Sequence, residues 1–311
     1  MTCAHSVANH GGRLYAIDRP GMGKTSSPYS THGTDTKNGN ENTNTDPNLD
    51  TFIENVWELV EDQGWEEFSV IGVSGGGPFT LALLASYLQI RRSKKDESNS
   101  RARLRNVCLV GAVCMSGGSD GMNNELKDMA TLVEECQDSK WSRFKLRAMA
   151  TSSGPIFNYL IPALPLSWNL YLSSFQHKTM PPADQEWMSD ESNIGPFLSL
   201  NRYIMAQGGY PGTYDDAMIA LRAGHSHEDF LEKIYGSPVT KEIEDEADGD
   251  LPMVGIFQGE MDTSVPSSHA RYMHETIFHK RSKLIEFEGL GHVSMISPKS
   301  DEYATFATAT R

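Results

Sequence analysis

The sequence has 311 residues, a formal net charge of −14 and a pI of about 5.1. Its length suffices for one large α/β domain or for a domain with an inserted lid, and its negative charge argues against nucleic acid and anionic membrane surfaces as partners. The four cysteines show no Cys-x-x-Cys spacing, so the sequence indicates no metal centre or redox motif of that kind.

The N-terminal residues lack both the basic start and the apolar core of a signal peptide. The most apolar stretch of the chain, residues 154–168, is interrupted by three prolines and is too short to cross a bilayer. Cys108 and Cys114 lie in an apolar run, which is typical of buried thiols. We therefore expect a soluble cytoplasmic protein without a membrane span.

The first informative segment is residues 13–17, whose apolar side chains predict a short buried strand. Before it, His10-Gly-Gly12 predicts the end of a helix followed by a turn. After it, Gly21-Met-Gly-Lys-Thr25 resembles a phosphate-binding loop, but that motif requires glycine at the position of Asp18. We therefore expect no nucleotide site.

Two polar segments, at residues 27–50 and 91–105, predict surface loops. Residues 27–50 contain almost no apolar side chains and predict a disordered surface loop, and residues 91–105 form a charged loop. Apolar residues at helical spacing from Leu49 to Val60 predict an amphipathic helix that ends near Gly64.

The centre of the sequence is a strand, a sharp turn and a helix. Residues 68–73 form an apolar run, Pro78 suits the first turn of a helix, and Gly72-Val-Ser-Gly-Gly76 between them fits Gly-x-Ser-x-Gly. Glycines are needed there because side chains two positions from a strained serine would collide across the turn. We predict Ser74 as the nucleophile, with the N–H of Gly75 as an oxyanion donor; the other interpretation is a glycine-rich connecting turn.

The remaining sequence changes character twice. Residues 105–115 predict a strand buried on both faces, whereas residues 120–236 show helical periodicity and many aromatic side chains. After an acidic loop, apolar runs predict strands at residues 251–257 and 283–287. We expect a core built from residues 1–119 and 237–311, with residues 120–236 as a helical cap inserted into it.

Three side chains are expected to meet at one edge of the sheet. Ser74, Asp262 and His292 each follow a predicted strand in a glycine-bearing loop, and the loops after parallel strands gather on one edge. An imidazole can take the serine proton, and a carboxylate can hold that imidazole in the required tautomer. Asp120 and Glu260 are alternative carboxylates. This chemistry needs neither a cofactor nor a metal.

The sequence resembles the α/β-hydrolases with a helical cap. This resemblance implies an eight-stranded, mostly parallel sheet and hydrolysis through a covalent intermediate on Ser74. It rests on the motifs Ile17-Asp-Arg-Pro-Gly-Met-Gly23, Gly72-Val-Ser-Gly-Gly-Gly-Pro78, Gln258-Gly-Glu-Met-Asp-Thr-Ser-Val-Pro266 and Gly289-Leu-Gly-His-Val-Ser294.

One departure from the family concerns the N-terminus. Family members have further strands, and a loop that supplies the second oxyanion N–H, before the turn that follows residues 13–17; here only about twelve residues precede that segment. We expect either a gap between residues 13–17 and residues 68–73 or direct pairing of the two. The hypothesis is an N-terminally shortened hydrolase with weakened or absent activity, because loss of one donor costs about a hundred- to a thousandfold in rate.

Three functions follow from these patterns. The first is a serine-dependent hydrolase that cleaves a carboxylic ester or a related small organic substrate. The alternative is a truncated, catalytically weak or inactive protein that keeps the fold for binding. A third is non-hydrolytic chemistry, such as lyase or perhydrolysis activity, with the same three side chains. The sequence indicates no oligomeric state.

Overall fold

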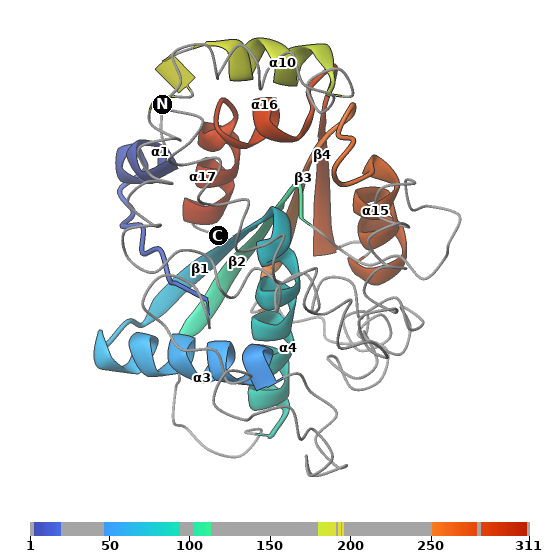
Figure 1. Cartoon of the computed structure of the whole chain (residues 1–311). Coiled ribbons are helices and arrows are strands. Elements are labelled where there is room, and N and C mark those ends of the chain that lie inside the picture. Colours follow the sequence, from blue (N-terminus) through green and yellow to red (C-terminus); the bar gives the residue numbers. More distant parts are fainter. Residues whose placement is uncertain are drawn as a thin grey trace, which may run out of the picture.

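The structure is a computed structural model that describes residues 3–19, 47–93, 102–112, 180–190, 192–193, 195, 251–278 and 281–309. Its centre is a parallel sheet of four strands, whose order in space is their order in the chain (Figure 1). The strands are β1 (Glu67–Val73), β2 (Arg103–Val110), β3 (Met253–Gly259) and β4 (Ser282–Phe287). The molecule is therefore an α/β protein with a parallel sheet, as the sequence predicts.

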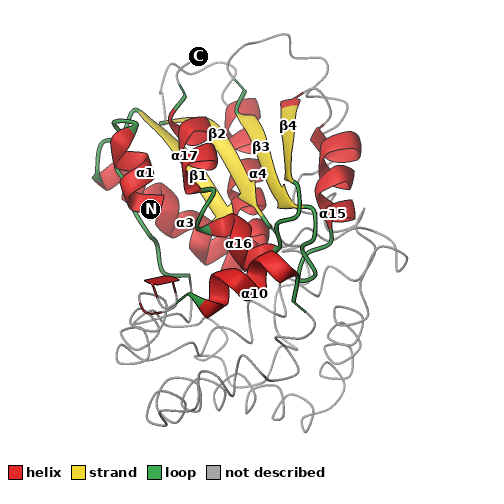
Figure 2. Cartoon of the chain, turned by 90° about the horizontal axis from the view of Figure 1, so that it is seen from above, coloured by secondary structure: helices red, strands yellow, loops and turns green. Residues whose placement is uncertain are grey.

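Helices cover both faces of this sheet (Figure 2). One face packs against α3, α4 and α15, and the other packs against α1 and α17. Their bounds are α1 (Cys3–Asn9), α3 (Pro47–Asp62), α4 (Gly77–Ser93), α15 (Ser267–Tyr272) and α17 (Ser300–Thr308). The shorter or peripheral elements are η2 (Ser74–Gly76), α10 (Pro182–Ser189), the π-helix η4 (Met273–Phe278) and α16 (His292–Ile296).

Strand β2 shows why the sheet needs a helical layer on each face. Val107 and Leu109 belong to the core under α3 and α4, whereas Cys108 and Val110 belong to the core under α17. All four side chains are fully buried, and this burial follows from the alternation of side chains along a strand. Residues 105–110 of the predicted run thus lie in a strand that is buried on both faces, as predicted, but the strand ends at Val110, and residues 113–115 lie outside the described residues.

The predicted strand at residues 13–17 is wrong. This segment has no regular secondary structure, and Leu14, Tyr15 and Ile17 are 39–44 % exposed. Within the described ranges, β1 pairs only with β2, and the segment contacts the fold through side chains, with the Tyr15 ring 4.6 Å from that of Trp65. Apolar residues favour a strand only where a neighbouring edge lies at hydrogen-bonding distance.

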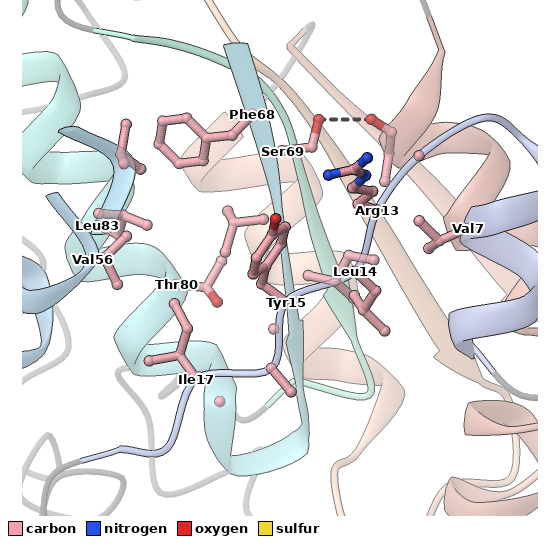
Figure 3. Close-up of a pocket in the computed structure, with 18 of the residues that line it drawn as sticks. Val7, Arg13, Leu14, Tyr15, Ile17, Val56, Phe68, Ser69, Thr80 and Leu83 are labelled. Carbon is pink, nitrogen blue, oxygen red and sulfur yellow. Dashed lines mark hydrogen bonds between the residues drawn. The ribbon is translucent and has the colours of Figure 1, made fainter. Parts of the chain in front are cut away.

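A pocket of about 810 Å³ lies between this segment and β1, lined also by side chains of α3 and α4. Figure 3 shows Arg13, Leu14 and Tyr15 on the segment as it runs alongside β1. Of the two outcomes expected for this place, a gap or direct pairing, the described residues show no direct pairing, and the pocket separates the segment from β1. The helix end predicted at His10 is confirmed, since α1 ends at Asn9 and Gly11 follows with a φ of 76°.

One predicted boundary is wrong, and several predicted segments lie outside the described residues. The expected loop at residues 27–50 is too long, because α3 already begins at Pro47. Most of the expected cap, residues 120–236, lies outside the described residues, and so do the rest of the polar loop, the acidic loop and Cys114. Helix α10 lies within the expected cap. No helix in the described part of the chain has the length and hydropathy that crossing a membrane requires.

Candidate active site

Ser74 lies in a strained turn between β1 and α4. Its φ is 50°, a left-handed value that residues other than glycine rarely adopt. Gly72 is required for this turn, because a Cβ atom there would lie 2.3 Å from Oγ1 of Thr80. A Cβ atom on Gly76 would meet nothing within 4 Å. The predicted collision is therefore right at Gly72 and wrong at Gly76.

The structure brings His292 to both of its predicted partners. Its Nε2 atom lies 3.0 Å from Oγ of Ser74, and its Nδ1 atom lies 2.7 Å from Oδ2 of Asp262. With Nδ1–H donating to the carboxylate, Nε2 is left to accept the serine hydroxyl. These residues come from the loops after β4, β1 and β3, which meet at the carboxyl edge of the parallel sheet.

The carboxylate of Asp262 is fully buried and held by several donors. Its Oδ1 atom accepts the backbone N–H groups of Ser264 and Val265, each at 2.8 Å, and its Oδ2 atom also accepts Nε2 of Gln258 at 3.2 Å. These bonds compensate the burial of a charged group.

Glu260 and Asp120 are the two alternative carboxylates for the contact with His292. Glu260 accepts the backbone N–H of Gly289 at 3.1 Å in an exposed position, so its carboxylate is directed at that turn and not at the imidazole of His292. Asp120 lies outside the described residues. Asp262 is thus the carboxylate that the structure places on the ring.

Gly111, at the end of β2, provides space for the imidazole. Its φ is 49°, and a Cβ atom there would lie 3.1 Å from the ring of His292 and 2.9 Å from the Met295 side chain. Gly75, the predicted oxyanion donor, follows Ser74 directly in η2. In the described part of the chain, no cluster of three histidine, cysteine, aspartate or glutamate side chains could hold a metal ion.

Sequence reasoning missed two charged residues that contact this site. Nη1 of Arg19 donates to the Gly75 carbonyl at 2.9 Å, and its guanidinium lies over the Phe79 ring at 5.1 Å. Its presence in the Asp-Arg-Pro-Gly turn was a usable signal. Asp184, on α10, accepts the backbone N–H of His292 at 2.9 Å. No pattern in the sequence around it points to the site.

Solved structures with a similar fold were found, whereas no protein-family model and no curated protein sequence matches the chain. A bromoperoxidase from Bacillus anthracis is 18% identical over 98% of this chain and 84% of its own, with a TM-score of 0.52. An esterase from Exiguobacterium antarcticum is 16% identical over 99% of this chain and 87% of its own, also at 0.52. An α/β hydrolase fold protein from Nakamurella multipartita is 18% identical over 98% and 86%, at 0.50. Together with the parallel sheet, these likenesses show that the chain has the α/β-hydrolase fold.

Proposed function

We propose that the protein is a serine hydrolase that cleaves a carboxylic ester or a related small organic substrate. The observation that carries this proposal is the continuous hydrogen-bonded series from Ser74 through His292 to the buried carboxylate of Asp262. The esterase among the solved structures of similar fold supports the same class of reaction.

The mechanism follows from the roles that these atoms can take. Nε2 of His292 accepts the hydroxyl proton of Ser74 as Oγ forms a bond to the ester carbonyl carbon. Asp262 holds the ring by accepting Nδ1–H and stabilises the imidazolium that forms. The N–H of Gly75 donates to the oxyanion.

The leaving alcohol then departs with the proton from Nε2, which leaves an acyl group on Oγ. Water attacks this acyl-enzyme, giving its proton to Nε2, and Oγ regains a proton as the acid is released. Each cycle thus consumes one ester and one water and returns the site to its starting protonation state.

A fluorophosphonate probe and a p-nitrophenyl ester test this proposal. We expect the wild-type protein to be labelled and to release p-nitrophenol, and Ser74→Ala to do neither. The matched control is Ser189→Ala, because that hydroxyl is exposed on α10 and contacts only the Gln185 carbonyl among the described residues. Labelling that persists in Ser74→Ala, or that is absent from wild type, would refute the assignment.

A binding protein that keeps the fold without catalysis is the second candidate, favoured by the open pocket beside β1. It predicts a wild-type protein that does not react with the probe but is stabilised against heat by a small-molecule ligand. Product analysis separates a third candidate, non-hydrolytic chemistry at Ser74, because only hydrolysis yields a carboxylic acid and an alcohol in equal amounts.

A further inference from the structure

Asp184 is a buried carboxylate that reaches the candidate base from outside the sheet. Its residue is 3 % exposed, and it lies on α10, which packs beside α16 (Figures 1 and 2). In the sequence, Asp184 lies between β2 and β3, in the segment that is expected to form the cap. A buried carboxylate needs several donors, because burial of an unpaired charge is costly.

The donors that satisfy Asp184 belong to the turn that carries the candidate base. Oδ2 accepts the backbone N–H of His292 at 2.9 Å. Oδ1 accepts the backbone N–H of Ser294 at 2.8 Å and its hydroxyl at 2.6 Å. The Ser294 hydroxyl in turn accepts the N–H of Gly291 at 2.9 Å. One carboxylate therefore accepts three hydrogen bonds from the first turn of α16.

The carboxylate of Asp184 also packs closely against the backbone of this turn. A Cβ atom on Gly291 would lie 2.3 Å from Oδ2 of Asp184, so the carboxylate rests directly against the backbone before the imidazole. The ring of His292 must keep two distances at once, 3.0 Å to Ser74 and 2.7 Å to Asp262. A shift of its backbone would break that geometry, and misplacement of a catalytic group by about 1 Å costs about a hundredfold in rate.

We propose that Asp184 is a positioning residue for His292. Its carboxylate fixes the backbone from which the imidazole projects, while Asp262 fixes the ring itself. The segment between β2 and β3 thereby helps to hold the base, His292, in the position that the reaction needs. This proposal rests on the hydrolase function proposed above.

Asp184→Asn is the main test, because an amide keeps the shape but turns one acceptor into a donor that faces an N–H or hydroxyl group. We expect kcat for a p-nitrophenyl ester to fall about ten- to a hundredfold, with KM within about twofold of wild type. Ser294→Ala removes the two bonds of the hydroxyl, to Asp184 and from Gly291, but keeps both backbone N–H bonds to the carboxylate, and we expect a loss of about three- to tenfold. The matched control is Glu186→Gln on the exposed side of the same helix, which should match wild type.

A purely structural role would lower the thermal midpoint but leave kcat unchanged at a temperature where circular dichroism shows a folded protein. That result in Asp184→Asn would overturn the proposal. If Asp184→Asn does not fold, Ser294→Ala decides, and wild-type kcat in that variant overturns it. The double variant should lose less than the product of the two single losses, because both changes act on one network.

The outcome remains interpretable if the hydrolase assignment itself fails. Absence of probe labelling in wild type would refute the proposed function and leave the positioning role testable by NMR. We expect the Nδ1–H of His292 that faces Asp262 to give a low-field proton signal, which should weaken or shift in Asp184→Asn and stay unchanged in Glu186→Gln. An unchanged signal in Asp184→Asn would overturn the positioning role.

Discussion

Replacing Asp262 by asparagine is expected to damage the site more than the small change in shape implies. The backbone N–H groups of Ser264 and Val265 both point at Oδ1, so the amide oxygen must take that position. The amide nitrogen then replaces Oδ2 and faces Nδ1 of His292. Two donors cannot share this contact, so Nδ1 must become the acceptor and the ring proton must move to Nε2.

This tautomer places an N–H opposite the hydroxyl of Ser74, where the reaction needs an acceptor. The same carboxylate-to-amide change in serine proteases lowers kcat by about 10⁴-fold. We expect a loss of that order for Asp262→Asn, measured as kcat for a p-nitrophenyl ester. Asp262→Ala presents no donor to Nδ1, so its loss should be no larger than that of the asparagine variant.

The geometry also defines the result that would refute this reasoning. An Asp262→Asn protein that keeps more than about a tenth of wild-type kcat would show that the His292 tautomer does not depend on this carboxylate. Circular dichroism must confirm that the variant is folded, because Gln258 also donates to Oδ2 and would face the new amide.

Three further predictions concern the turn, the core and the charged neighbour of the site. Gly72→Ala should lower the free energy of unfolding by about 1–3 kcal/mol because its Cβ atom has no room, whereas Gly76→Ala, in open space, should change it by less than about 1 kcal/mol in urea denaturation. Burial raises the pKa of the Cys108 thiol and of the Tyr303 phenol above their ordinary values of 9.0 and 10.0. As the pH rises, the unfolded chain therefore loses these protons before the folded protein does. The free energy of unfolding should then fall as the pH rises above about 9. Each group contributes a slope of up to about 1.4 kcal/mol per pH unit, and Tyr303→Phe should reduce the slope measured by urea denaturation above pH 10. Arg19→Gln should lower kcat about tenfold with little change in KM, because the carbonyl beside the nucleophile loses its donor.

Each of these predictions has a result that contradicts it. Equal unfolding energies for the two glycine variants would mean that the turn relaxes around the new side chain. An alkaline slope unaffected by Tyr303→Phe would assign the pH dependence to other groups. Wild-type kcat in Arg19→Gln would show that the contact of that guanidinium with the turn does not matter for the reaction. The control is Arg105→Gln, which removes a cation near the start of β2, at the opposite end from the site.

The strands were predictable wherever the apolar run is also buried on both faces. Residues 105–110 are such a case, since successive side chains enter the two cores on opposite faces of the sheet. Residues 13–17 have the same apolar character, but among the described residues no strand pairs with them. A strand needs a partner segment, and the residues of one segment do not show whether a partner is present. Composition alone could therefore not distinguish a strand from an extended segment that touches the fold through side chains.

The three candidate site residues were predictable because each follows a strand. Ser74, Asp262 and His292 lie in glycine-bearing loops after β1, β3 and β4, and parallel topology brings such loops together. Asp184 has no comparable signal, because its contact depends on how α10 packs beside α16. Helix packing is determined by contacts between distant segments, which no local pattern encodes.

The hydrogen bond between His292 and Ser74 joins residues that are 218 positions apart. In a growing polypeptide Ser74 is therefore made 218 residues before His292, the imidazole that the folded chain places beside it. Under the proposed function, the hydroxyl of Ser74 gains its base only after β4 has joined the sheet and the turn that follows it has brought His292 into place.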